Sequence, residues 1–147
     1  MPIADATAPR PVNEPVKSYE PGSRERAALK SALEDAAKSK VELPLFIGGR
    51  DVETASSLPM RSPHDHELEL GRFSQGDASH VNAAIEAALT ARAGWAALSQ
   101  NERSSVFLKA AELAATSFRY RLNAATMLGQ SKTAYQAEID SACELID

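Results

Sequence analysis

The sequence predicts an α+β fold, in which an extended N-terminal arm and a short β-hairpin with a small sheet precede several α-helices. Three observations predict it. Five of the first 22 residues are prolines, two short apolar strands flank a Gly-Gly pair, and apolar side chains recur at helical spacing after Asp77. With 147 residues, 44% hydrophobic and 24% charged, the chain has the composition of one globular domain or part of one.

Charge and cysteine content exclude several classes of protein. The 16 basic and 20 acidic side chains give a formal net charge of −4, and the chain has no basic block of the kind that binds nucleic acid. No stretch approaches the roughly 18–20 apolar residues of a membrane span. A single cysteine excludes an internal disulfide and favours a reducing compartment. The first ten residues resemble no targeting signal, so we expect a cytoplasmic protein, with the mitochondrial matrix as the alternative.

The first 22 residues are expected to form an extended arm, because each proline removes an amide donor and disfavours helical geometry before it. Ser23 then caps a helix over residues 24–39. The apolar stripe of this helix is thin, so it is expected to lie on a larger body; it comprises Leu29, Leu33, Ala36 and Ala37. We take residues 23–147 as the unit that follows the arm.

Three short strands are expected next. Leu45–Ile47 and Arg50–Val52 flank Gly48-Gly49, which predicts a hairpin with a two-residue turn. Glu67–Leu70 alternates polar and apolar residues, the period of a half-buried strand. A sheet this small needs a surface to pack on, and the helices that follow are the candidates.

The remaining chain is predicted to be helical. One long helix starts near Asp77, and its apolar face comprises Val81, Ile85, Ala88, Leu89 and Ala96, with Trp95 as a core residue beside it. Ser99 and Glu102 have the spacing of a capping box at the start of a second long helix. A third, shorter helix is expected to close at Gly129. A fourth runs to Ile146 without a stop signal, so we expect the chain to continue past Asp147.

Several candidate sites have simpler structural interpretations. Cys143 lies on the apolar stripe of the last helix and is interpreted as a buried structural thiol, its pKa raised by neighbouring acids. A metal site is possible at the only histidine cluster, but a polar surface turn is favoured there; the cluster comprises His64, Asp65, His66 and His80. No glycine spacing matches a phosphate-binding loop. Lys132 follows a short polar stretch and could bind an anion, but a solvated lysine is favoured.

Four acids gather on the last helix, at Glu138, Asp140, Glu144 and Asp147. The simpler interpretation is an acidic solvent face. Alternatively, an acid beside the apolar stripe could point toward a ligand and accept an ammonium group. Glu144 is best placed for this role because it neighbours Cys143.

The sequence also resembles the aldehyde dehydrogenases, and among them the L-glutamate γ-semialdehyde dehydrogenases, or 1-pyrroline-5-carboxylate dehydrogenases, of proline degradation. The resemblance covers nearly the whole chain in family order but only about the first quarter of the family's length. The similar segments are VNEPV (12–16), PGSRERAAL (21–29), SPHDHE (62–67), NAAIEAALTARAGW (82–95), RSSVFLKAAEL (103–113) and MLGQSKTAYQAEIDSACELID (127–147).

This resemblance implies an oxidoreductase that acts on a small-molecule substrate, uses NAD and forms a homo-oligomer. The family's catalytic thiol, glutamate base and most of its dinucleotide-binding fold lie beyond Asp147, so no catalytic or cofactor-binding residue is expected in this chain. The chain alone is expected to be an inactive fragment that does not bind NAD. Glu144 matches a glutamate that borders the substrate. The alternative is a stand-alone helical interaction module derived from the same family.

Overall fold

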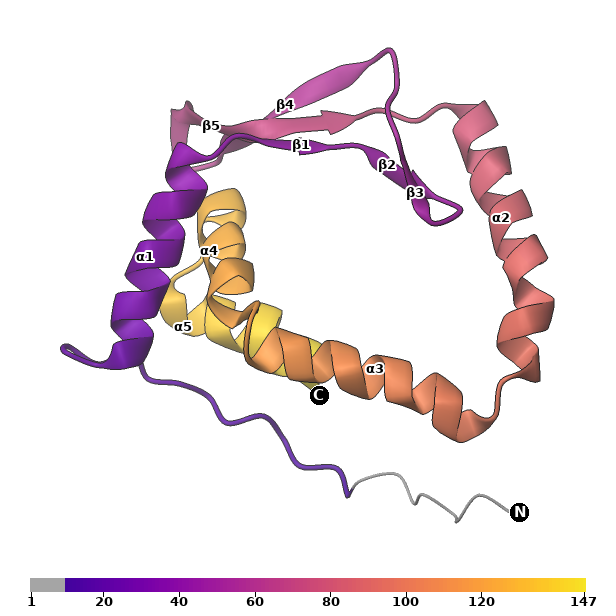
Figure 1. Ribbon diagram of the computed structural model, residues 1–147. Coiled ribbons are helices and arrows are strands. Elements are labelled where there is room, and N and C mark those ends of the chain that lie inside the picture. The colour runs from indigo at the N-terminus through magenta and orange to yellow at the C-terminus, as the bar shows by residue number, and fades with distance from the viewer. Residues whose placement is uncertain (1–9) are drawn as a thin grey trace.

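The computed structural model describes residues 10–147, so the first nine residues of the predicted arm lie outside the described part. Within it, residues 10–20 form neither helix nor strand, and a turn follows at Pro21–Gly22. The elements that follow mix helices with small sheets, which confirms the predicted α+β class. In Figure 1 the strands cross the top between α1 on one side and α2 on the other, and α3 runs along the bottom.

Helix α1 (Arg24–Lys38) is the first helix that the sequence predicted, and Ser23 caps it by accepting from the Arg26 amide. It packs on α4 (Arg119–Gln130), and the main core lies between them. Leu29 and Ala124 are buried there beside Tyr19 from the arm. Leu33 and Ala36 pack at the margin as expected, whereas Ala37 is exposed.

The main sheet has three strands in the order β1-β5-β4, over Val41–Leu43, Asp65–Ser74 and Ser57–Ser62. The predicted strand at Glu67–Leu70 lies within β5. Strand β1 pairs with β5 in parallel, with Val41 opposite Gly71. A Cβ atom on Gly71 would lie 2.1 Å from the Val41 carbonyl oxygen, so only glycine allows β1 to approach so closely.

The predicted hairpin is confirmed as β2 (Leu45–Ile47) and β3 (Arg50–Val52), joined at Gly48-Gly49. Both glycines have positive φ angles, of 61° and 80°, which the turn requires. The expectation that the hairpin and Glu67–Leu70 would share one sheet is wrong. The hairpin is a separate two-stranded sheet, because β5 pairs with β1 and β4 instead.

Helices α2 (Ala78–Ala97) and α3 (Gln100–Ala115) confirm the two long helices of the prediction. Asp77 caps α2, and the predicted capping box of Ser99 and Glu102 begins α3. Trp95 packs edge to face on Phe107, with ring centroids 6.4 Å apart, and so joins the two helices. It is nevertheless 43% exposed, so its assignment to the core is wrong for the described structure.

The third predicted helix is confirmed as α4, but it does not end at Gly129. The residue with the left-handed cap conformation is Ser131, with φ of 57°. The last predicted helix also has the expected extent, as α5 (Ala134–Ala137), the π-helix η1 (Glu138–Cys143) and α6 (Glu144–Ile146). In residues 10–147 no helix is both long and apolar enough to cross a lipid bilayer.

Candidate functional site

The helical segment Ala134–Ile146 holds the candidate site residue Glu144 and contains an unusual turn. The sequence pattern predicted an ordinary α-helix there, but the structure has π-helical geometry over Glu138–Cys143. The Glu144 amide donates to the carbonyl of Ile139, five residues earlier, rather than to the fourth. Such turns are rare and frequent at functional sites. This hydrogen bond ends the wide turn at the backbone of Glu144 itself.

Glu138, at the start of the π turn, is fully buried together with Arg119 of α4. The guanidinium contacts the carboxylate through Nε at 3.2 Å and through Nη2 in a close ion pair. The interpretation of Glu138 as part of an acidic solvent face is therefore wrong. An isolated buried charge is unstable in a protein interior, so the pair is stable only because the two charges meet.

Further donors complete the coordination of the Glu138 carboxylate. The Tyr19 hydroxyl donates to Oε2 at 2.5 Å, the Asn123 amide donates to the same oxygen at 2.8 Å, and the Lys17 backbone amide donates to Oε1 at 2.8 Å. In residues 10–147 every buried side-chain nitrogen and oxygen has a hydrogen-bond partner. The cluster is therefore a fully satisfied polar network, which rigidifies its surroundings.

This network shifts the pKa of its members. Burial raises the pKa of Glu138, but hydrogen bonds from Arg119 and Tyr19 outweigh burial, and the pKa lies below its usual value. Burial likewise opposes the charged form of Arg119, yet hydrogen bonds to Glu138 and Glu14 raise its pKa above normal. The pKa of Tyr19 is raised by burial and by the Glu138 carboxylate. At neutral pH Glu138 is thus a carboxylate, Arg119 a guanidinium and Tyr19 a neutral phenol.

Cys143 is buried, as the sequence predicted. Its sulfur lies 3.7 Å from Nη2 of Arg119 and 4.0 Å from Oε1 of Glu138. Burial raises its pKa, with a further contribution from Glu138 and Glu14, so the direction of the shift is as expected while its main causes differ. A buried thiol with a raised pKa is a poor nucleophile.

Glu144 is exposed, in contrast to Glu138. Among the ion pairs of residues 10–147 none involves its carboxylate. Asp140, one turn earlier, pairs with Lys132 instead. Lys132 therefore has an acidic partner, which weakens its alternative role as an anion ligand, and Glu144 is the acid on this segment that is free to meet a cation.

The histidines of the possible metal site are separated by the fold. The Nδ1 atom of His64 forms a hydrogen bond of 2.8 Å with the hydroxyl of Ser131. Both residues line a cavity of about 340 Å³ at the end of α4. His80 instead contacts Asp77 at 2.7 Å in the α2 cap. In the described part of the chain no three His, Cys, Asp or Glu side chains gather as a metal site would require.

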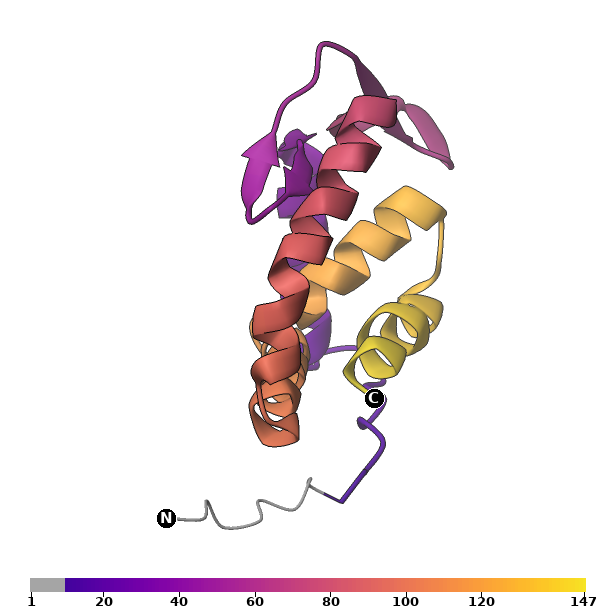
Figure 2. The same ribbon diagram turned by 90° about the vertical axis from the view of Figure 1, so that its right-hand side faces the viewer.

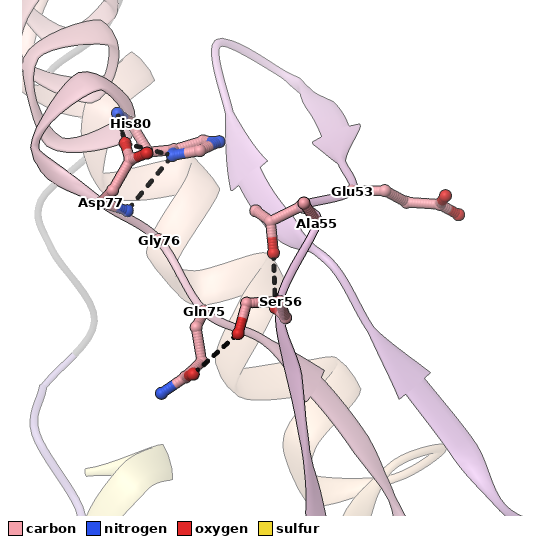
Figure 3. A pocket seen from close by; sticks show the side chains of 8 residues that line it. Glu53, Ala55, Ser56, Gln75, Gly76, Asp77 and His80 are labelled. Atoms are coloured by element: carbon pink, nitrogen blue, oxygen red, sulfur yellow. Dashed lines mark hydrogen bonds and ion pairs between the residues drawn. The ribbon is translucent and has the colours of Figure 1, made fainter.

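A second cavity, of about 440 Å³, lies where β4 and β5 meet the start of α2. Figure 3 shows that Asp77 and His80 point toward each other there, while the Glu53 side chain points away. The Ser56 hydroxyl donates to Gln75 at 3.0 Å. Hydrogen bonds from Ser79 and His80 lower the pKa of Asp77. Asp77 and His80 thus serve the α2 cap, while Ser56 and Gln75 bond to each other, so these groups are engaged without a ligand.

A wide apolar face covers α2 and α3. Helix α2 buries none of its residues, and α3 buries only Ala114. Soluble monomers rarely expose so many large apolar side chains on two helices, and such exposure marks surfaces for other protein segments. The large apolar side chains exposed on these two helices are Val81, Ile85, Leu89, Trp95, Val106, Phe107, Leu108 and Leu113.

Comparison with known proteins identifies the class. Residues 50–147 match the aldehyde dehydrogenase family, and the chain belongs to that family. This match begins at β3 and includes the α2–α3 face, the Arg119–Glu138 cluster and Glu144.

Particular members of the family are similar over a longer stretch. The chain is 45% identical over 146 residues to delta-1-pyrroline-5-carboxylate dehydrogenase of Agaricus bisporus, covering 99% of this chain and 27% of that protein. It is 42% identical over 135 residues to the human mitochondrial enzyme of the same name, covering 92% and 24%. The NAD-bound Mycobacterium tuberculosis enzyme superposes with a TM-score of 0.93 at 46% identity, over 97% of this chain and 27% of that one.

The chain therefore spans about a quarter of the length of the curated relatives that it matches. The expectation from the sequence that it resembles this subfamily along nearly its whole length is confirmed. The buried Arg119–Glu138 pair is the feature that sequence reasoning missed. The sequence held one indication of this buried pair. Arg119 and Asn123 are four residues apart, so they lie on one side of α4, the side that also carries Tyr120 and Ala124.

Proposed function

We propose that this chain is the N-terminal part of an NAD-dependent dehydrogenase that oxidises L-glutamate γ-semialdehyde, formed from 1-pyrroline-5-carboxylate, to L-glutamate in proline degradation. The observation that carries the proposal is the similarity to delta-1-pyrroline-5-carboxylate dehydrogenases over 99% of the chain. It includes the segment around Glu144, where the carboxylate is exposed and has no ion-pair partner within residues 10–147.

NAD accepts a hydride in enzymes of this kind. The glycines described here do not fit a phosphate cradle, because Gly48 and Gly49 form the β2–β3 turn and Gly71 accommodates β1. We therefore assign no step of the reaction to this part of the chain. The nucleophile, the general base and the NAD site are proposed to lie outside it, and the chain alone is proposed to be inactive.

The role that we propose for Glu144 is substrate orientation. The semialdehyde carries an α-ammonium group, and a carboxylate on the wall of the aldehyde site can pair with it. Such a contact fixes the substrate without taking part in bond making, so its loss weakens binding of this substrate more than it slows the chemical step. The π turn ends at the Glu144 backbone and so fixes the point on the helix from which this side chain projects.

A substitution tests this role in the enzyme expressed from the complete reading frame. Glu144→Gln removes the charge and keeps the size, and we expect it to raise KM for the semialdehyde about 10- to 100-fold, the range for a charged hydrogen bond of roughly 1.5–3 kcal/mol. Glutarate semialdehyde lacks the ammonium group, so its KM is expected to stay unchanged. NADH formation measures both.

Glu34→Gln serves as the matched control, because Glu34 is an exposed glutamate on α1. An equal effect of Glu144→Gln on both aldehydes would contradict the assignment of Glu144. Absence of NAD-dependent oxidation of the semialdehyde by the unmodified enzyme would contradict the proposed activity itself. NADH production by the 147-residue chain alone would contradict its proposed inactivity.

The apolar face of α2 and α3 supports a second candidate, a stand-alone helical interaction module. The two candidates differ in the reading frame after codon 147. A frame that continues into a dinucleotide-binding fold with a cysteine and a glutamate supports the dehydrogenase, and the face is then covered by the rest of the enzyme. A stop codon there supports the interaction module.

The setting of the complete enzyme is also proposed. The human relative is named as mitochondrial. Of the two locations that the sequence left open, the cytoplasm and the mitochondrial matrix, this name favours the matrix. We propose a homo-oligomer with a small-molecule substrate and no nucleic-acid or membrane partner. We also keep the division into an arm, residues 1–22, and a following unit, residues 23–147, as a proposal.

A further inference from the structure

The N-terminal arm contacts both ends of the segment that carries Glu144. Near its start, the Lys17 amide and the Tyr19 hydroxyl donate to the Glu138 carboxylate. Near its end, the Glu14 amide donates to Oδ1 of Asp147 at 2.7 Å. Figure 2 shows the arm passing beside the C-terminal end of the chain. We call residues 14–19 the arm clasp.

The arm clasp also reaches the helix through Arg119. The guanidinium donates to the Pro15 carbonyl at 2.9 Å and forms an ion pair with the Glu14 carboxylate, in addition to its pair with Glu138. One buried arginine therefore connects the arm, α4 and the start of the π turn. Residues 139–146 are thus fixed at both ends by the same stretch of arm.

Tyr19 indicates that the clasp holds a strained conformation. Its φ of 54° lies in the left-handed region, which a tyrosine rarely adopts. Such strain persists where the surroundings determine the conformation, and it gathers at functional sites. Three contacts hold Tyr19 in place. Its hydroxyl donates to Glu138 and accepts from Asn123, and its ring packs edge to face on Tyr120 with centroids 6.5 Å apart.

We propose that the arm clasp positions Glu144 for the substrate ammonium, with Tyr19 and Glu138 as positioning residues that fix the start of the π turn. This inference rests on the proposed function. The π turn ends in the hydrogen bond from the Glu144 amide to Ile139, so movement at Glu138 passes directly to the backbone of Glu144. Tyr19 and Glu138 are positioning residues rather than substrate contacts, since both are buried.

Tyr19→Phe in the enzyme from the complete reading frame tests the clasp, because it removes one donor to Glu138 and leaves the ring in place. We expect KM for glutamate γ-semialdehyde to rise about tenfold, the order of effect of a misplaced positioning group. The kcat and the KM for glutarate semialdehyde are expected to stay within about twofold, because the positioned carboxylate serves only the ammonium group. A general loss of folding would lower activity toward both aldehydes.

A second variant and a double variant keep the two proposals apart. Asp147→Ala removes the far contact of the clasp and is expected to act in the same direction as Tyr19→Phe. Tyr19→Phe added to Glu144→Gln is expected to raise KM no further than Glu144→Gln alone, because both act on one contact. Tyr135→Phe, which removes an exposed hydroxyl from α5, is the matched control and is expected to leave both KM values unchanged.

The outcomes are distinguishable. If Glu144→Gln discriminates between the aldehydes but Tyr19→Phe does not, or if the double variant is additive, the clasp proposal is wrong and the proposed function stands. If Glu144→Gln shows no discrimination, both the role of Glu144 and the clasp proposal fall. Hydrogen exchange provides an independent readout: the amides of residues 139–147 are expected to exchange faster in Tyr19→Phe than in Tyr135→Phe, and equal rates would overturn the clasp.

Discussion

The two sides of the molecule differ in how much of their helices they bury. On one side, the thin stripe of α1 buries Leu29 against α4, and a saturated polar cluster forms around Glu138. On the other, helix α2 is longer than α1 but buries no residue. Figure 1 shows these sides as separate parts of an open frame, with α2 opposite α1. Apolar periodicity therefore reports that a helix forms, and not whether its partner lies within the same stretch of chain.

The largest expected effect on this contrast comes from Arg119→Met in this chain. It removes the counter-charge of Glu138, and an uncompensated buried charge costs about 3–5 kcal/mol of unfolding free energy. Urea-induced unfolding followed by circular dichroism measures the change. Arg92→Met on the exposed surface of α2 is the control, expected within about 0.5 kcal/mol of the unmodified chain. If the two variants lost similar unfolding free energy, the proposed difference between the side of α1 and α4 and the side of α2 would be wrong.

A pair of leucines tests the apolar part of the same contrast. Leu29 is 4% exposed on α1, whereas Leu89 is 55% exposed on α2. We expect Leu29→Ala to lower the unfolding free energy by about 2–4 kcal/mol through lost burial and a cavity. Leu89→Ala is expected to cost less than about 1 kcal/mol, because it removes little buried surface. Thermal unfolding measures both variants. If Leu89→Ala lowers the unfolding free energy as much as Leu29→Ala does, Leu89 is packed against another segment in solution, and the exposed face of α2 is wrong.

The smallest expected effect is a pH dependence of the unfolding free energy, and it arises from the cluster around Glu138. The pKa of Glu138 is lowered in the folded state, so its charge contributes stability that is fully present above the unfolded pKa of about 4.3. That contribution is lost as pH falls through the lower, folded pKa. Glu138→Gln is thus expected to cost about 1.5–3 kcal/mol at pH 7.

This difference between Glu138→Gln and the unmodified chain is expected to shrink as the pH is lowered below about 4. Urea unfolding at a series of pH values measures it. Glu144→Gln, at an exposed site, provides the comparison and is expected to change stability little at any pH. A difference for Glu138→Gln that grows on acidification would show that the carboxylate is not held ionised.

Local signals predicted much of the fold. The capping box of Ser99 and Glu102 and the Gly48-Gly49 turn act within a few residues, so they are visible in the sequence. Strand β1 was missed because its only ladder is a parallel pairing with β5, some thirty residues on. Strand β4 was missed because Pro59 lacks a ladder donor and marks an edge strand. Ser131 replaced Gly129 as the left-handed residue because α4 runs two residues further than its glycine suggested.

The candidate site could be predicted only in part. Exposed Glu144 and buried Cys143 follow from helical periodicity and residue type. The burial of Glu138 does not, because a glutamate in an acidic run has the same local pattern whether water or an arginine lies opposite. Its partners come from the arm and from α4, far away in sequence. Only the three-dimensional arrangement brings them together.

The π turn makes the direction in which Glu144 projects depend on the geometry of the turn as well as on the residues in it. An extra residue is accommodated between Glu138 and Cys143. Deleting one residue there would restore α-helical spacing and leave Glu144 close to its present face. If instead the same residues formed a regular α-helix without a deletion, Glu144 would be rotated by about 100° about the helix axis. The direction of this carboxylate thus depends on the helical geometry of the residues before it, even where their sequence is the same.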